Sequence, residues 1–129
     1  MLLELAPVDP RSLMQGDYMA LRWRVARDMP QTATTNAQGG YVVLAVDASH
    51  VASFRRLDDG ASLTADEIRM RYRVRQGAPK FATNAFFFEE GRASDYNKAR
   101  FGEFRVAPDG EAILTGLRDA AFAKLGKTQ

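Results

Sequence analysis

The segment "DEIRMRYRVR", residues 66–75, decides the fold class, because apolar and basic side chains alternate without interruption from Ile68 onward. A repeat of two residues is typical of a β-strand with one buried face. On a helix the same apolar residues would be scattered around the circumference. We therefore expect a strand whose apolar face consists of Ile68, Met70, Tyr72 and Val74. The opposite face would be basic and consist of Arg69, Arg71, Arg73 and Arg75.

Shorter β signals surround this strand. Further strands are expected at residues 2–5, 41–46, 51–57 and 86–88, and a hairpin at 103–117 that turns at Pro108-Asp109-Gly110. The 41–46 strand is continuously apolar, which predicts that both of its faces are covered. Residues 28–40 are polar and glycine-rich and predict a long mobile loop. Helical content is expected between residues 91 and 102, with Ser94 as N-cap, and in the tail at 118–126.

These elements predict a mainly β fold, a small antiparallel barrel or sandwich of about seven or eight strands with one or two short helices. We expect one domain over residues 1–129.

Composition excludes several classes of function. The net charge of +2 is too small to favour nucleic-acid binding. The chain has no cysteine, so disulfides, thiolate metal sites and a cysteine nucleophile are excluded. Its single histidine, His50, excludes multi-histidine metal sites. No phosphate-binding glycine loop, dinucleotide fingerprint or nucleophile elbow is present, and we predict no metal and no cofactor.

The stretch "QGDYMALRWRVA", residues 15–26, begins with a turn and continues as a second alternation. We expect a strand that buries Met19, Leu21, Trp23 and Val25 and exposes Tyr18, Ala20, Arg22 and Arg24. Asp17 has two interpretations. It is either a carboxylate at the rim of a pocket, with Tyr18 beside it, or a residue that fixes the turn through backbone N–H groups, which is the commoner role.

Residues 16–23, Gly-Asp-Tyr-Met-Ala-Leu-Arg-Trp, resemble the signature of the bacterial GDYXXLXY protein family. The preceding "LELAPVDPRSLMQGDY" (3–18) and the later "FFFEEGRASDYNKARFGEFRVAPDGEAILTGLRD" (86–119) are also similar to that family. Trp23 stands where the family has its closing tyrosine, which preserves aromatic packing and loses the hydroxyl. The resemblance implies an N-terminal membrane anchor preceding this domain, a location outside the cytoplasmic membrane, and multi-spanning membrane proteins as partners. It implies no established activity and no catalytic residues.

The arginines provide the main candidate for binding. If the strand with Arg22 and Arg24 pairs with the strand of Arg69, Arg71, Arg73 and Arg75, the shared face could hold anionic lipid headgroups, phosphate or an acidic peptide through bidentate hydrogen bonds. Near a membrane, each basic residue contributes about 1 kcal/mol of attraction to anionic lipid. The commoner alternative is a solvated face that acids on neighbouring strands neutralise.

Candidates for catalysis follow the aromatic strand. Glu89 and Glu90 lie beside the phenylalanines, and a carboxylate against aromatic rings can have a raised pKa and act as a general acid or base. Arg100 could contribute to such a polar site, which we would expect where this segment meets Asp17. The alternative is a charged strand end in ordinary ion pairs.

Ser94 and Lys98 have the i, i+4 spacing that a Ser/Lys nucleophile pair would need on a helix, although this spacing is common by chance. We therefore expect an interaction or assembly role at the cell envelope rather than catalysis. The alternative is an envelope hydrolase that uses the Ser/Lys pair or the carboxylates.

Overall fold

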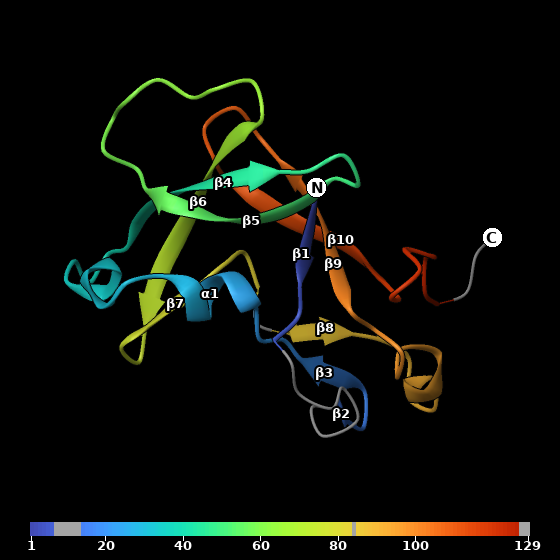
Figure 1. Cartoon of the computed structure of the whole chain (residues 1–129). Coiled ribbons are helices and arrows are strands. Elements are labelled where there is room, and N and C mark those ends of the chain that lie inside the picture. The colour runs from blue at the N-terminus through green and yellow to red at the C-terminus, as the bar shows by residue number, and fades with distance from the viewer. Residues whose placement is uncertain (7–13, 84, 127–129) are drawn as a thin grey trace.

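The computed structural model describes residues 1–6, 14–83 and 85–126, and these are mainly β (Figure 1). The strands are β1 (Leu2–Glu4), β2 (Met14–Gln15), β3 (Tyr18–Ala20), β4 (Gly40–Val46), β5 (Val51–Leu57), β6 (Glu67–Arg75), β7 (Ala78–Lys80), β8 (Ala85–Phe87), β9 (Phe101–Val106) and β10 (Ala112–Arg118). One short α-helix, α1 (Arg24–Asp28), and the 3-10 helices η2 (Gln31–Thr34) and η3 (Ala93–Asp95) complete the described elements. None of the described helices has the length and apolar character to cross a membrane.

Seven strands form a curled half-barrel in the order β10-β9-β1-β5-β4-β6-β7. Strand β1 pairs in parallel with β5 and antiparallel with β9, so the sheet is mixed rather than purely antiparallel. A second, small sheet has the order β2-β3-β8 and lies beyond the end of β1 in Figure 1. The mainly β fold class is confirmed.

The alternation at 66–75 forms strand β6, as predicted. Met70 and Tyr72 are buried on its apolar face, with 0% and 5% of their surfaces exposed. Its neighbour β4 has Val42, Val43 and Leu44 fully buried, which confirms that this strand is covered on both faces. Apolar residues of β4 and β6 thus form the centre of the core.

The stretch at 15–26 differs from the single strand expected there. Strands β2 and β3 form a hairpin across Gly16, whose φ of +48° a glycine adopts without strain. The strand ends at Ala20, Trp23 makes one isolated bridge to Leu5, and α1 begins at Arg24.

The predicted burial on this stretch is nevertheless confirmed, because Met19, Leu21, Trp23 and Val25 are all at most 4% exposed. Helix α1 buries Val25 where it packs near β1, β5 and β7. The alternation therefore identifies correctly which side chains are buried, although the backbone that buries them changes from strand to helix within this stretch.

The predictions of helices at 91–102 and 118–126 were wrong. The first segment contains only η3, with Ser94 inside it rather than at an N-cap. Tyr96 instead packs between Phe86 and Phe88, with ring centroids at 5.0 and 5.3 Å, and this tertiary packing overrides helix propensity. The described part of the tail is a turn in which the Asp119 carboxylate accepts two backbone N–H bonds.

The 28–40 segment contains more regular secondary structure than the long loop that its composition predicts. It contains the last residue of α1 and the 3-10 helix Gln31–Thr34. Within that helix Ala33 is buried, and its carbonyl accepts a hydrogen bond of 2.7 Å from the Tyr72 hydroxyl. A buried core side chain on β6 thus fixes this segment.

Candidate binding site

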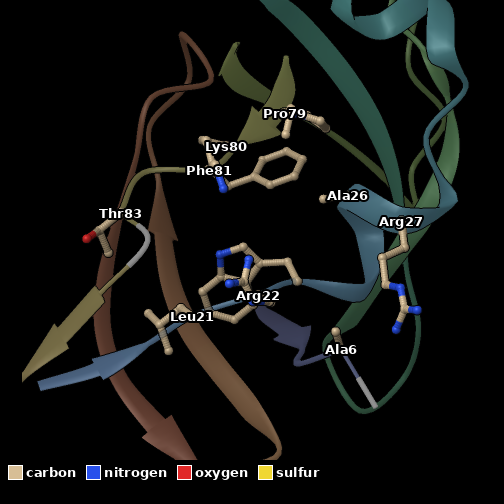
Figure 2. Close-up of a pocket in the computed structure, with 11 residues that line it drawn as sticks. Ala6, Leu21, Arg22, Ala26, Arg27, Pro79, Lys80, Phe81 and Thr83 are labelled. Carbon is tan, nitrogen blue, oxygen red and sulfur yellow. The ribbon is translucent and has the colours of Figure 1, made fainter. Parts of the chain in front are cut away.

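A cavity of about 410 Å³ lies between the segment that follows the Gly-Asp-Tyr turn and the segment that follows β7 (Figure 2). We call it the apolar hollow. It is lined by Ala6, residues 21–23, Ala26, Arg27, residues 78–81 and Thr83. Figure 2 shows Leu21, Arg22 and Ala26 approaching it from one side and Pro79, Lys80 and Phe81 from the other. Two segments more than 50 residues apart thus build one concave site.

The first wall is positioned by backbone hydrogen bonds next to β1. The Ala6 N–H donates to the Arg22 carbonyl at 2.8 Å, and Leu5 forms the isolated bridge with Trp23. Trp23 has extended dihedrals as the N-cap of α1, so the chain changes direction at this residue. Helix α1 then places Ala26 and Arg27 on the hollow.

The second wall depends on the tight hairpin between β6 and β7. Gln76 and Gly77 have φ values of +54° and +74°, and positive φ at both central residues is the mark of the type I′ turn that suits a two-residue hairpin. The turn pairs Arg75 with Ala78 and returns the chain along β6. Phe81 is thereby buried to 1% exposure, directly below the hollow.

The floor of the hollow is aromatic and tightly packed. The Trp23 ring meets Phe104 edge-on with centroids 5.1 Å apart, and the far end of its six-membered ring lies against the backbone of Gly102. Phe81 lies next to Tyr72, at 6.4 Å between centroids, and burial raises the pKa of the Tyr72 phenol. These contacts hold the floor in one arrangement, as ligand sites that are largely pre-formed require.

The rim of the apolar hollow is cationic. Arg22 and Arg27 are exposed, Lys80 is half-buried, and no acidic side chain occurs among the described residues that line the cavity. A second cavity of about 490 Å³ lies next to it and shares Lys80 and Thr83. We call this second cavity the basic hollow; its lining comprises Arg73, Arg75, Gln76, Lys80, Ala82 and Thr83.

The single arginine face that strand pairing would have produced does not form, because the strand ends at Ala20, Arg22 lies beyond it and Arg24 is the first residue of α1. Acids on adjoining segments neutralise several of the arginines. Arg69 binds Asp58 at 2.7 Å, Arg71 and Arg73 lie 3.6 and 3.1 Å from Glu111, and Arg24 lies 3.5 Å from Glu4. Arg22 instead lines the apolar hollow, and Arg73 and Arg75 line the basic one.

The region where Asp17 meets the aromatic strand exists, but it is open to solvent. The Phe88 N–H donates to the Asp17 carbonyl at 2.9 Å, and Tyr18 lies 5.8 Å from the ring of Phe87, which is 70% exposed. Asp17, Glu89 and Glu90 are all exposed, and so is Arg100.

Ser94 and Lys98 are exposed on a turn that is not α-helical. Nearby, Arg92 binds Asp95 at 2.6 Å, and this carboxylate raises the pKa of the guanidinium. Within the described ranges, no group of three or more histidine, aspartate or glutamate side chains is arranged to hold a metal ion.

The model of the GDYXXLXY protein family matches residues 1–117. The chain belongs to the GDYXXLXY family. The family has no established activity, and neither a curated protein nor a solved structure matches the chain significantly. The last two named positions of the family signature fall on Leu21 and Trp23, and both line the apolar hollow. The signature thus marks one wall of this cavity.

Sequence reasoning missed most of the lining, including its two further cations and its second buried ring, Arg27, Lys80 and Phe81. For the last two a usable signal exists in the dipeptide Gln76-Gly77, a polar residue and a glycine between two strand-like runs. This dipeptide indicates a hairpin in which the residues that follow it, "APKF", run back along β6, next to the arginines. Nothing in the sequence places this hairpin opposite α1.

Proposed function

We propose that this chain is the binding domain of a bacterial envelope protein, with an interaction or assembly role rather than a catalytic one, and that its ligand is anionic lipid. The observation that supports this proposal is the apolar hollow itself. An aromatic floor, three cationic side chains at the rim and no acid among the described lining residues suit a partner with an apolar part and a negative charge.

The proposed location is the outer side of the cytoplasmic membrane, to which an N-terminal segment preceding this domain would anchor the protein. An anchor keeps the domain close to a lipid surface, where basic residues gain about 1 kcal/mol each from anionic headgroups. The exposed Arg22 and Arg27 provide two such charges beside the opening of the hollow. A multi-spanning membrane protein is the proposed assembly partner.

The hydrolase alternative receives no support from the geometry of its candidate residues. Ser94 and Lys98 are exposed, and no burial activates either as nucleophile or base. Glu89 and Glu90 are exposed beside the aromatic strand rather than enclosed by it.

Vesicle co-sedimentation tests the proposal. We expect the chain to bind vesicles that contain phosphatidylglycerol and not vesicles of phosphatidylcholine, and the double variant Arg22→Glu, Arg27→Glu to lose this binding. The matched control is Lys98→Glu, Arg105→Glu, which changes the net charge equally at exposed positions outside both hollows. Equal loss in both double variants, or no binding by the unmodified chain, would refute a role for the hollow.

A further inference from the structure

The two hollows have opposite chemical character and share one wall. Lys80 and Thr83 line both cavities, so the cavities adjoin at these two residues. On one side lie the buried rings of Trp23 and Phe81, and on the other lie Arg73 and Arg75. A ligand that spans this wall meets apolar surface at one end and positive charge at the other.

We propose that the two hollows form one site for a single-chain amphiphilic anion. Its alkyl chain lies in the apolar hollow over Trp23 and Phe81, and its phosphate or carboxylate lies in the basic hollow between Arg75 and Lys80. This inference rests on the proposed function and specifies how one lipid-like molecule is held.

The charges of the basic hollow favour Arg75 and Lys80 as the anion ligands. Arg73 already shares Glu111, at 3.1 Å, so part of its hydrogen-bonding capacity is used. Arg75 is exposed, and its guanidinium donates a 3.0 Å hydrogen bond to the adjacent Val74 carbonyl, which leaves further N–H donors. Lys80 is half-buried on the shared wall, so its ammonium can reach an anion from either side. A guanidinium and an ammonium together suit an acid with several oxygens.

The apolar hollow has the dimensions and surface that an alkyl chain needs. Its volume of about 410 Å³ lies within the range of small-molecule sites, about 300–1,000 Å³. Leu21, Trp23 and Phe81 are each at most 4% exposed and form a fixed floor. The half-buried Ala26, Ala78 and Pro79 around this floor supply more of the apolar surface that an alkyl chain would contact. Each methylene group removed from water contributes to binding, and the contribution grows with chain length.

Trp23 makes the proposal directly measurable, because it is the only tryptophan of the chain and lines the hollow. Its fluorescence would be followed during titration with dodecyl phosphate below the concentration at which micelles form. We expect a saturable change with dodecyl phosphate and with dodecanoate. At the same concentrations, inorganic phosphate (a head without a chain) and dodecyl maltoside (a chain without charge) should give none.

Two variants assign the ends of the ligand. The double variant Arg75→Gln, Lys80→Gln should bind dodecyl phosphate at least about tenfold more weakly, because the charge-assisted hydrogen bonds of both side chains are removed. The matched control Lys98→Gln with Arg105→Gln should leave the affinity unchanged. Ala26→Phe fills the apolar hollow from α1 and should abolish the response, and its thermal midpoint would verify that it folds.

The outcomes separate this inference from the proposed function. If dodecyl phosphate leaves Trp23 unchanged while phosphatidylglycerol vesicles still bind through Arg22 and Arg27, the single-chain site is wrong and the membrane role stands. An equal response to dodecyl maltoside, or unchanged affinity in Arg75→Gln, Lys80→Gln, would also overturn the inference. If the vesicles do not bind either, both proposals fail.

Discussion

The contact between Gly102 and Trp23 yields the sharpest test of the packing under the apolar hollow. A Cβ at position 102 would lie 2.7 Å from Cζ3 of Trp23, with Cη2 closer still, and 3.0 Å from Cδ1 of Leu114. Carbon atoms pack at about 3.5–4.0 Å, so the indole would have to move by about 1 Å. Trp23 is only 4% exposed and is held by Phe104, so such a movement is opposed.

Gly102→Ala should therefore destabilise the fold through crowding, by about 1–3 kcal/mol. The matched control is Gly116→Ala on the neighbouring strand β10, where the nearest heavy atom to the new Cβ is Cε of Lys124, at 3.9 Å. Neither glycine has a positive φ, so both variants gain the same about 0.4–1 kcal/mol from a less flexible unfolded chain. The difference between them then isolates the crowding.

Urea denaturation monitored by circular dichroism measures this difference. We expect Gly102→Ala to be about 1–3 kcal/mol less stable than Gly116→Ala. The double variant Trp23→Phe, Gly102→Ala should lose less stability than the sum of its single variants, by at least about 0.5 kcal/mol, because phenylalanine lacks the crowded ring carbons. Equal stabilities of the two alanine variants, together with strict additivity in the double variant, would refute the packing described here.

Three further predictions concern the rest of the fold. Tyr72→Phe should cost about 1–3 kcal/mol because the buried Ala33 carbonyl loses its donor, and hydrogen exchange should accelerate at residues 31–34. Burial raises the pKa of Tyr72 above its ordinary 10.0. The stabilisation is therefore present below pH 10 and is lost as the pH rises through the folded-state pKa. The unfolding free energies of the unmodified chain and of Tyr72→Phe, measured against pH, test this expectation. The Arg118 guanidinium lowers the pKa of Glu103 from 4.5. The unmodified chain should therefore be more stable than Glu103→Gln by at most about 1 kcal/mol above pH 4.5. This difference in unfolding free energy should vanish as the pH falls through the folded-state pKa of Glu103. Phe87→Ser should change the unfolding free energy by less than about 0.5 kcal/mol because this ring is 70% exposed, and a larger loss would mean that it packs in the core.

The sequence predicted burial better than it predicted backbone conformation. At 66–75 the two agreed, because β6 runs between two partners, β4 and β7, and its period of two persists over the whole strand. At 19–25 the same period placed four side chains in the core correctly, yet the strand ended after Ala20. The chain meets Leu5 through one bridge and then turns into α1, and this tertiary contact is invisible in a local pattern.

The site was the least predictable part. Arg22, Arg73 and Arg75 were singled out because arginines recur along one face of a strand, and each lines a hollow. The expected route, pairing of their two strands, was wrong. Proximity arises instead from the curl of the seven-stranded sheet and from the hairpin at Gln76-Gly77, which sets Lys80 and Phe81 opposite α1. Such long-range placement depends on sheet topology, and the periodicity of a single strand carries no information about that topology.

The most direct test of the central claim is a titration of the ¹⁵N-labelled chain with dodecyl phosphate, followed by amide chemical shifts. The account predicts saturable shifts concentrated at residues 21–27 and 73–83, the segments that line the two hollows. Inorganic phosphate at equal concentration should leave residues 21–27 unchanged. Shifts centred on β8 and β10, or no shifts at either lining segment, would contradict a ligand site beneath the family signature.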